Sequence, residues 1–482
     1  MQSLTILTIT IQCNMKKQLI LSVLMLCSLP LLAQVSRSDD FHQRYKLKEV
    51  VIFSRHNARS PITDGSSSLG RMTPNTWTSW SSDASELTLR GGVLETQNGQ
   101  FFRKWVVSEG LLPENARPAS DEVRIYANGK QRTIATARYF TSGFMPVSDV
   151  LVERNVEFNK TDPVFNLLYD KVPDYVPAIA QQQLVEKFGE DGLTKISKSL
   201  KSNYELLAEV LDLKHSDIYT SGELTGFEDY TTKLYFKDYE EPLIDGSLNA
   251  ASSAADALLL QSYEETDPLK AGFGHELTDD QWRQIATIKY YQNDVRFCLP
   301  VIANHFAYNI LGVIRDELQR PDRKFTLLVG HDTNITCLLN ALKIEMPPTT
   351  NSIEPFVPIG SKIVFEKWVD ASGNEYVGIN HVYQSTSQIR HQEMLFLSNP
   401  PMMRALTVDG LTANADGLYS LADVIKQIDA SRQSEENVAN GITPAVSATS
   451  NASAAKYSIA GQQISQAAPG QPYIVSGKKF VN

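Results

Sequence analysis

The strongest constraint on the fold is an alternation of short apolar runs and helical segments between about Lys48 and Asp429. Three apolar runs bounded by polar segments predict buried strands, over Glu49–Phe53, Val123–Ala127 and Phe325–Val329. Each strand is followed by a segment with helical spacing of its apolar residues, over Gly91–Leu112, Thr133–Thr141 and Ile335–Leu342. Two further runs flank the turn sequence DASGNE and predict a hairpin, formed by Ile363–Val369 and Tyr376–Tyr383. This order of elements predicts an α/β core.

The middle of the chain predicts a second architectural unit. Between about residues 149 and 321 the pattern is mostly helical, with long periodic stretches over Gln181–Leu213 and Leu277–Gln319. We expect this block to form a helical cap on the core, within a main domain that covers residues 34–430.

The composition changes after about Ser431. Residues 431–455 are rich in Ser, Ala, Asn and Glu, which predicts a linker. Residues 456–482 contain two short strand-like pieces around Pro469-Gly470. They predict a small C-terminal tail, either a β-module or a sorting tail, and a disordered extension is the alternative.

Residues 1–33 are typical of a targeting segment. Met15–Ala33 places two lysines before an apolar run that ends in a small residue, which is the pattern of a secretory signal peptide. This predicts that Met15 is the true first residue and that the mature chain is periplasmic or otherwise exported. A membrane anchor is the alternative, but the run Gln18–Ala33 is short and contains Pro30.

Removal of that segment leaves two cysteines, Cys298 and Cys337, both in apolar runs. Export permits a disulfide between them. Their surroundings favour two buried free thiols, because a buried cysteine behaves as a small hydrophobic residue.

Composition and missing motifs exclude several classes of function. The chain has 45 Lys and Arg against 55 Asp and Glu and no dense basic block, so we expect no nucleic-acid partner. The eight histidines show no HxH or HExxH spacing and there is no CxxC pair, so we expect no metal site and no cofactor. The absence of a GxxxxGK[ST] loop gives no support to nucleotide hydrolysis of the P-loop kind.

The segment with the clearest chemistry is Ser54–Pro61, SRHNARSP, which directly follows the first predicted strand. Ligands of α/β sheets bind at the ends of strands. Arg55 and Arg59 offer planar donor forks that match phosphate oxygens. His56 offers a nitrogen that can attack phosphorus, and the flanking cations favour the neutral imidazole that a nucleophile needs.

The other two predicted strands also end in groups suited to a phosphate. Arg132 lies in NGKQRT after the second strand, and His331 and Asp332 lie in GHDTN after the third. If the three strand ends meet, the three arginines and His331 can surround a phosphoryl group, which leaves Asp332 to protonate the leaving oxygen. Each motif alone also fits a solvated charge cluster, but their ordered conjunction is far more specific.

With these motifs the chain resembles the histidine acid phosphatases, and within them the periplasmic glucose-1-phosphatases of bacteria. The matching stretches span most of Lys48–Asp429 and are RHNARSP at 55–61, TPNTW at 73–77, LTLRGGVLE at 87–95, YANGKQRTIAT at 126–136, GHDTN at 330–334 and IGSKIVFEKW at 359–368. Asn57 stands where the related phytases typically carry Gly. The tail after about Ser431 and the small number of mature cysteines depart from the family pattern.

The resemblance implies a phosphoglycerate-mutase-like α/β core with a mostly helical cap. It also implies a phosphohistidine intermediate on His56, proton donation to the leaving alcohol by Asp332, and phosphoryl binding by Arg55, Arg59, Arg132 and His331. In the middle block, Glu264 is similar in setting to a glutamate of the glucose-1-phosphatases, which implies a contact with a sugar hydroxyl. A solvated acid within YEETD is the alternative for Glu264.

We therefore expect a secreted, metal-independent acid phosphomonoesterase of sugar phosphates, with glucose-1-phosphate as its substrate. A phytase or a broad-specificity acid phosphatase is the alternative within the enzymes. Phytate is very anionic, and the acidic stretches Tyr239–Pro242 and Tyr263–Asp267 disfavour it. A non-catalytic surface sugar-binding protein is the alternative from another class, and intact His56 and Asp332 oppose it. We expect a small phosphate ester as the partner and no integral membrane contact, while the oligomeric state stays open.

Overall fold

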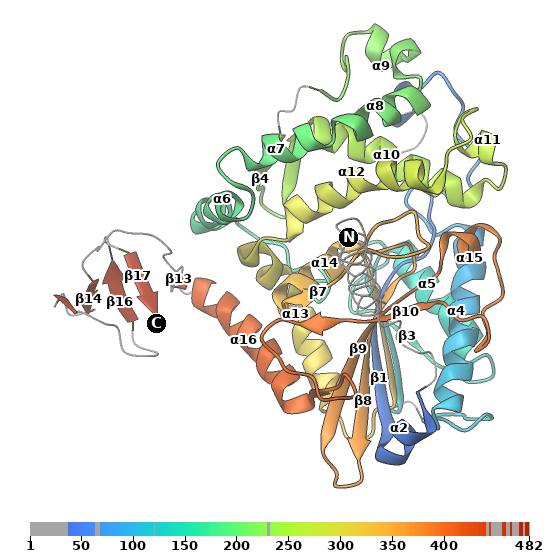
Figure 1. The fold of residues 1–482 in the computed structure, drawn as a ribbon, viewed down its shortest axis with the longest axis vertical. Coiled ribbons are helices and arrows are strands. Elements are labelled where there is room, and N and C mark those ends of the chain that lie inside the picture. The colour runs from blue at the N-terminus through green and yellow to red at the C-terminus, as the bar shows by residue number, and fades with distance from the viewer. Residues whose placement is uncertain are drawn as a thin grey trace, which may run out of the picture.

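The computed structural model describes residues 37–62, 68–119, 121–228 and 232–439, and beyond them the backbone of five short strands (Figure 1). The expected signal peptide lies outside the described residues. The described chain forms a central β-sheet with helices on both faces, and a second group of helices lies above one end of the sheet (Figure 1).

The central sheet is formed by β1 (Tyr45–Arg55), β2 (Val123–Ala127), β3 (Val152–Glu153), β6 (Phe325–Gly330), β8 (Lys362–Asp370), β9 (Glu375–Tyr383), β10 (Met402–Ala405) and β12 (Tyr419–Ser420). Their order is β10-β9-β8-β1-β6-β2-β3, and β12 pairs with β9. The pairs β1–β6, β6–β2 and β2–β3 are parallel, whereas β1–β8, β8–β9 and β9–β10 are antiparallel. The three strands and the hairpin predicted from the sequence are confirmed.

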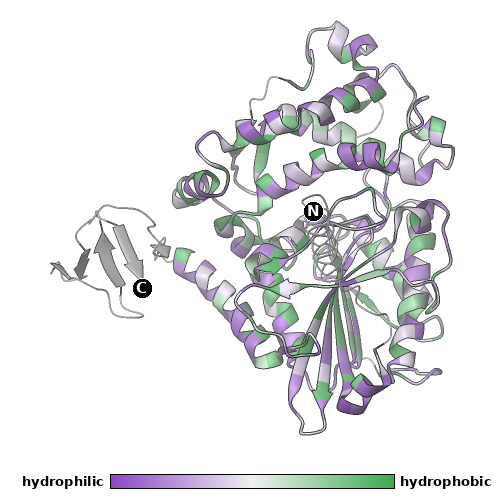
Figure 2. Ribbon diagram, viewed as in Figure 1, coloured by the Kyte–Doolittle hydropathy of each residue, from purple (hydrophilic) through white to green (hydrophobic). Residues whose placement is uncertain are grey.

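The sheet is buried on both faces. Val50 and Ile52 of β1 pack into one helical layer, and Val51 and Phe53 pack into the other, as the two-residue period of a strand requires. The first layer contains α4 (Leu89–Ser108) and α5 (Gln131–Phe144), and the second contains α13 (Pro300–Leu318), α14 (Asp332–Ala341) and α16 (Leu421–Ala439). Burial on both faces explains the continuous apolar runs in the sequence, which Figure 2 shows along the central strands.

The cap has an apolar core of its own, to which α8, α10 and α12 contribute most of the buried side chains. Its elements are α7 (Gly192–Ser199), α8 (Lys201–Val210), η1 (Leu213–His215), α9 (Asp217–Thr220), β4 (Thr232–Tyr235), β5 (Leu243–Gly246), α10 (Ser247–Glu264), α11 (Pro268–Ala271) and α12 (Asp279–Phe297). The fold is thus an α/β core with a mostly helical cap. Shorter elements complete it: α2 (Asp39–Arg44), α3 (Ser68–Arg71), β7 (Ile344–Glu345), α15 (Thr386–Arg390) and β11 (Thr407–Val408).

Two helices of the middle block belong to the core rather than to the cap. α6 (Tyr175–Phe188) and α13 bury their apolar side chains with those of the central sheet. α12 and α13 meet at an 85° bend, and Pro300 begins the second helix. The sequence pattern put both helices in the cap because helical spacing shows that a helix has a buried face. It does not show whether that face packs on the central sheet or in the cap.

Within the described residues, a search for membrane spans finds no single helix that is sufficiently long and apolar. The bent pair α12–α13 satisfies the length and composition criteria only when its two helices are taken together. Most of the apolar side chains of α13 are buried in the main core.

The helix α16 extends into the region where composition predicts a linker. Residues 431–439 form its last turns, so the linker does not begin at Ser431. The buried positions of the helix have the spacing of one helical face and are Leu421, Val424, Ile428, Ser431 and Glu435. The last of these is polar, and its carboxylate lies 2.8 Å from Nδ1 of His305 on α13. Polar residues on the inward face concealed the amphipathic pattern from the sequence analysis.

The backbone beyond residue 442 pairs into a small sheet. Its strands are β13 (Thr443–Pro444), β14 (Lys456–Ser458), β15 (Gln463–Ile464), β16 (Pro472–Val475) and β17 (Lys478–Val481). Their order is β13-β17-β16-β14-β15, and β14 and β16 are antiparallel to one another.

The two cysteines of the described chain are free and buried. Burial raises the pKa of Cys298 to about 12, so it stays a thiol at neutral pH. The prediction of two buried free thiols is confirmed.

A buried ion pair joins the sheet to α4 beside the end of β1. Lys362 and Glu95 are 1% and 0% exposed, and the ammonium lies 2.9 Å from the carboxylate. The same ammonium donates to Ser54 Oγ (3.1 Å), and the carboxylate accepts from Asn57 Nδ2 (2.8 Å). This pair therefore fixes the position at which the chain leaves β1.

We expect Lys362→Met to lower the free energy of unfolding by about 3–5 kcal/mol, because it leaves the Glu95 carboxylate buried and unpaired. Urea denaturation measures the change. Lys324→Met is the matched control: its pair with Glu122 is partly exposed, so its loss should be no more than about 1 kcal/mol. Equal losses in both variants would contradict the role of burial.

Candidate active site

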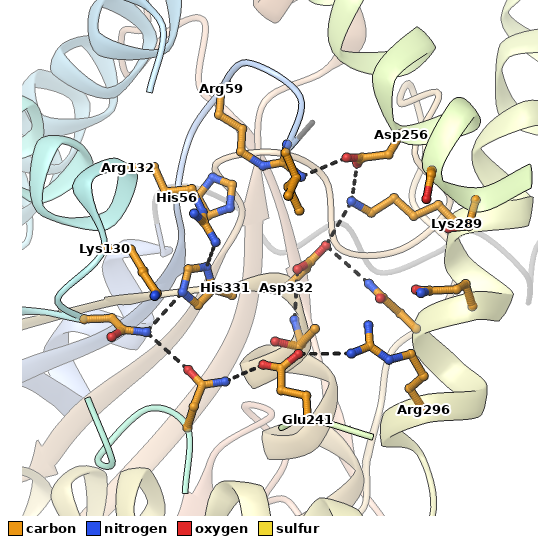
Figure 3. A pocket seen from close by; sticks show the side chains of 18 of the residues that line it. His56, Arg59, Lys130, Arg132, Glu241, Asp256, Lys289, Arg296, His331 and Asp332 are labelled. Atoms are coloured by element: carbon orange, nitrogen blue, oxygen red, sulfur yellow. Dashed lines mark hydrogen bonds and ion pairs between the residues drawn. The ribbon is translucent and has the colours of Figure 1, made fainter. Parts of the chain in front are cut away.

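The carboxyl ends of three adjacent parallel strands lie side by side beneath the cap. In the sheet register, Arg55 of β1 is opposite Gly330 of β6, and Val329 of β6 is opposite Ala127 of β2. The residues that follow these strands therefore meet at one edge of the sheet. They line a cavity of about 380 Å³ that is closed on its other side by the cap (Figure 3).

The structure brings most of the predicted site residues to this cavity. Five of them line it: His56, Arg59, Arg132, His331 and Asp332. Arg55 lies just behind this wall, and its Nη2 is 3.5 Å from the carboxylate of Asp332. The expected convergence of the three strand ends is thus present in the fold.

The loop after β1 is held by backbone hydrogen bonds. The His56 N–H donates to Gly330 O (3.0 Å), and His56 O accepts from the Gly360 N–H (3.1 Å). The Thr88 N–H, at the start of α4, donates to Ala58 O (3.0 Å). Gly91 comes so close that a Cβ at this position would lie 2.2 Å from Ala58 O. Close packing of α4 therefore fixes the loop that carries the imidazole.

The imidazole of His56 presents a free nitrogen to the cavity. Its Nδ1 lies 2.9 Å from the backbone oxygen of Asn57. A carbonyl oxygen only accepts, so Nδ1 carries the proton and Nε2 keeps its lone pair. Burial lowers the pKa of His56 well below its ordinary value, and Arg132 and His331 lower it further. The ring therefore stays neutral in acidic solution, which is the form that can act as a nucleophile.

Asn128 fixes the proton of His331 in the same way. The Oδ1 atom of Asn128 accepts from the backbone N–H groups of Gly129 (2.7 Å) and Asp162 (3.0 Å), so its amide nitrogen faces the imidazole. That nitrogen donates to His331 Nε2 at 3.0 Å, which leaves the proton on Nδ1. This Nδ1 lies 3.4 Å from Nη2 of Arg132. Two donors thus lie side by side, as recognition of a shared oxyanion requires.

Each of the three arginines has one N–H donor that no described residue accepts. The Nε–H groups of Arg55, Arg59 and Arg132 are buried and have no hydrogen-bond partner within the described part of the chain. Arg55 is 2.8 Å from Glu354, and Arg59 is 2.8 Å from Asp256. Arg132 forms no ion pair with any described residue.

The missing counter-charge of Arg132 has an electrostatic consequence. Burial, together with the neighbouring charge of Arg59, lowers the pKa of Arg132 to about 10. A buried cation without a counter-charge is costly, and a bound phosphoryl group would supply that charge.

The carboxylate of Asp332 begins α14 and is surrounded by donors. Its Oδ2 lies 3.4 Å from Lys289 Nζ and 3.5 Å from Arg55 Nη2, and it accepts from Asn293 Nδ2 at 3.2 Å. Its Oδ1 accepts from the Thr333 N–H at 3.0 Å. Burial by itself raises the pKa of Asp332, but Lys289 and Arg55 outweigh it and hold that pKa well below its ordinary value. Asp332 is therefore ionised while the cavity contains no other anion.

Glu241 contributes a carboxylate from the loop between β4 and β5. It accepts from Asn166 Nδ2 at 2.7 Å and lies 3.1 Å from Arg296 Nη2 (Figure 3). Enclosure by the surrounding protein raises the pKa of Glu241 above its ordinary value. Because 30% of its side chain remains exposed, the carboxylate is accessible from the cavity.

The sequence analysis missed several charged groups at the site, namely Glu241, Asp256, Lys289, Arg296 and Glu354. One of them left a usable signal: Asp256 stands alone in the apolar run Ala254–Leu260 of α10. A charged residue on a buried helix face requires a partner, so an isolated acid in such a run indicates an ion pair. The other four lie in segments of ordinary composition. The positions of Glu241, Lys289 and Arg296 follow only from the docking of the cap, and that of Glu354 follows from the segment before β8.

Glu264 does not reach this cavity, so the predicted sugar contact is not supported. It lies about two turns beyond Asp256 along α10. Its carboxylate accepts a hydrogen bond from the Thr88 hydroxyl and lies 3.9 Å from Arg90. Glu264 therefore joins the cap to the start of α4, whereas Ser252, Ser253 and Asp256 face the cavity from the same helix.

No group of three or more His, Cys, Asp or Glu side chains in the described ranges is arranged to hold a metal ion. The charge that could stabilise an oxyanion in this cavity comes instead from guanidinium, ammonium and imidazole groups.

Comparisons with known proteins agree with this geometry. The family model of the histidine phosphatase superfamily (branch 2) matches residues 46–383. The glucose-1-phosphatase of Salmonella typhimurium is 33% identical over 398 residues, which cover 81% of this chain and 94% of that protein. The phytase AppA of Escherichia coli is 26% identical, with 80% of this chain and 92% of that protein covered.

A solved structure shows the same fold. The apo form of Hafnia alvei phytase superposes with a TM-score of 0.74 at 26% sequence identity, covering 82% of this chain and 98% of that one. The family match extends over more than half of the chain and includes all three strand ends at the cavity. The chain therefore belongs to the histidine phosphatase superfamily, branch 2, and is a phosphatase.

Proposed function

We propose that this chain is an exported acid phosphomonoesterase that hydrolyses sugar phosphates, glucose-1-phosphate above all, through a phosphohistidine on His56. One observation carries the proposal: the unprotonated Nε2 of His56 faces a cavity in which buried, unpaired arginine donors and an aspartate converge. Such a set can bind a phosphoryl group, attack it and protonate what leaves.

In the first step, the lone pair of His56 Nε2 forms the N–P bond as the ester P–O bond breaks. Arg55, Arg59, Arg132 and the Nδ1–H of His331 stabilise the charge on the phosphoryl oxygens. Asp332, protonated in the substrate complex, gives its proton to the departing oxygen.

In the second step, water attacks phosphorus and the N–P bond breaks. Asp332 takes the proton from that water, and inorganic phosphate and neutral His56 are restored. The proton on Asp332 is thus given and recovered once in each turnover.

The two depressed pKa values favour acidic conditions. His56 remains an uncharged nucleophile at low pH because its pKa is lowered. The pKa of Asp332 is lowered as well, so its acid form grows as pH falls. A bound phosphate dianion opposes the surrounding cations and so raises the pKa of Asp332 in the complex. Cleavage that needs the acid should therefore be lost as pH rises.

The cavity wall supports a small polyol as the leaving group. Hydroxyl and amide side chains also line it, namely Thr161, Asn166, Ser252, Ser253, Gln292 and Asn293. No Phe, Tyr or Trp is among the described lining residues. Glu241, rather than Glu264, is then the acid that can accept hydrogen bonds from a sugar.

A phytase remains the second candidate. Lys130 and Arg296 also line the cavity, and two of the comparisons above are with phytases. Glu241 and Asp256 add negative charge to the cap wall, which opposes a substrate with several phosphates. The glucose-1-phosphatase relative has the higher identity of the two sequences compared above.

Export and a sorting role of the tail are part of the proposal. Residues 15–33 have the pattern of a secretory signal peptide, and they lie outside the described residues. The tail at residues 456–482 follows the phosphatase domain as a separate small sheet of strands.

We expect His56→Ala to fold as the wild type does but to lose at least about a thousandfold in kcat, because it removes the nucleophile. During turnover of a radiolabelled ester, an alkaline quench should trap acid-labile phosphate on the wild type and none on the variant. Normal turnover in the variant, or no trapped phosphate at a rate-competent level, would count against the intermediate.

We expect Asp332→Asn to lower kcat/KM for glucose-6-phosphate by about 100- to 10,000-fold, because an alkyl leaving oxygen needs a proton. The loss for 4-nitrophenyl phosphate should be much smaller, since its leaving group needs less protonation. Steady-state rates of both esters on the same preparations test the acid role. Equal losses for the two esters would exclude it.

We expect Glu241→Gln to lower kcat/KM for glucose-1-phosphate by about 10- to 100-fold through loss of a charged hydrogen-bond acceptor. Inhibition by inorganic phosphate should stay the same, and phytate should become a better substrate relative to the sugar. Glu264→Gln is the matched control, because that carboxylate lies outside the cavity. A wild-type preference for phytate would instead favour the phytase assignment.

A further inference from the structure

A continuous chain of ion pairs crosses the floor of the cavity. It alternates in charge and runs through Arg59, Asp256, Lys289, Asp332, Arg55 and Glu354. Its members come from the loop after β1, from α10, α12 and α14, and from the segment before β8. Among the residues of this ion-pair series, Lys289 is the one cap residue that forms an ion pair with Asp332 (Figure 3).

Lys289 is held between two carboxylates. Its ammonium forms an ion pair with Asp256 on α10 and lies 3.4 Å from Oδ2 of Asp332. Its side chain is 14% exposed, and those of Asp256 and Asp332 are 16% exposed. Asn293, one turn further along α12, donates to the same Oδ2 atom. Both contacts from α12 therefore favour the charged form of Asp332 over the protonated one.

Other charged groups also face Asp332, and some oppose its protonation while others favour it. Arg55 opposes its protonation from the end of β1, Arg59 from the loop that follows, and Arg132 from α5. Acids favour its protonation: Asp256 from α10, Glu241 from the β4–β5 loop and Glu354 beside Arg55. His331 is neutral because its Nε2 accepts from Asn128, and His56 is neutral because burial and Arg132 hold its pKa well below the ordinary value. Among the cations, Lys289 lies closest to the carboxylate, at 3.4 Å.

We infer that Lys289 is a positioning residue that keeps Asp332 ionised until a phosphate ester enters, and so sets the pH above which esters with poor leaving groups are no longer cleaved. This inference rests on the proposed acid role of Asp332. A bound phosphoryl dianion competes with Asp332 for the ammonium and weakens its hold on the carboxylate. Asp332 is then protonated only when a leaving group is present to receive its proton.

The strength of the contact is sufficient for a measurable effect. Two unit charges at this separation interact strongly even when partly screened, so loss of one shifts the partner's titration by about one pH unit or more. Removing a cation raises the pKa of a neighbouring acid, so the acid form persists to higher pH.

The experiment compares the pH profiles of kcat/KM for glycerol 2-phosphate and 4-nitrophenyl phosphate. Both substrates carry the same kind of phosphate group, so the difference between their profiles isolates the need for the acid. On the alkaline side of the profile, which we call the alkaline limb, kcat/KM falls as pH rises. We expect Lys289→Met to move this fall for glycerol 2-phosphate to higher pH by about one pH unit or more. The limb for the nitrophenyl ester should stay in place. Lys289→Arg keeps the charge and should keep the wild-type limb.

Lys130→Met is the matched control for loss of one positive charge from the cavity. Lys130 lines the same cavity, but its ammonium donates to Asn159 O at 2.9 Å and makes no ion pair with Asp332. It should change KM without moving the alkaline limb. An unmoved limb in Lys289→Met, or the same movement in Lys130→Met, overturns the inference.

Asp256→Asn gives an independent test with the opposite sign. It removes the second partner of Lys289, and with it the partner of Arg59, while keeping the shape of the side chain. The ammonium of Lys289 then pairs with Asp332 alone, so we expect kcat/KM for glycerol 2-phosphate to fall at lower pH than in the wild type. A movement to higher pH, or none, would contradict the inference even if Lys289→Met failed to fold.

The test separates this inference from the proposed function. If Asp332→Asn loses the alkyl ester selectively but Lys289→Met leaves the limb in place, the function stands and the role of Lys289 falls. If Asp332→Asn treats both esters alike, the acid role itself falls and the inference falls with it.

Discussion

The arrangement of the site depends on the cost of burying several positive charges at one place. Arg55 and Arg59 are 2% and 4% exposed, and Arg132, which is half-buried, lines the same cavity as Arg59. Such a cluster is unstable unless each charge meets a carboxylate or a ligand. The fold supplies Glu354 and Asp256 for two of these charges and leaves the third without an ion pair among the described residues. A bound anionic phosphoryl group can supply the counter-charge that Arg132 lacks among the described residues.

This requirement links the cap to the core. Asp256 and Lys289 come from helices whose apolar faces build a separate hydrophobic core, yet their charged ends meet the strand ends of the sheet. The cap therefore does more than shape a pocket, because its Lys289 is one of the cations that keep Asp332 ionised. Membership of the histidine phosphatase superfamily covers both parts, because the family model matches residues 46–383.

The strands and the motif residues could be predicted because their signals are local. Val50–Phe53 and Phe325–Val329 are apolar on both faces, and the polar motifs begin where those runs stop. The expectation for Glu264 rested on a resemblance in the middle block, and the sequence does not say which of the two acids of α10, Asp256 or Glu264, faces the cavity. The end of α16 was missed because the ion pair of Glu435 with His305 replaces an apolar contact on its buried face.

The sequence by itself determined the α/β core, the three strand ends and the polar residue types that follow them, because strand burial and the preference of ligands for strand ends act over short stretches of chain. Only the tertiary structure decided which cap residues reach the cavity, which imidazole nitrogen is free and which carboxylate stays charged. Those properties arise from contacts between residues far apart in the chain, such as Lys289 with Asp332 and Asn128 with His331. Proton positions follow from the partner that each atom finds after folding, and no local pattern encodes that partner.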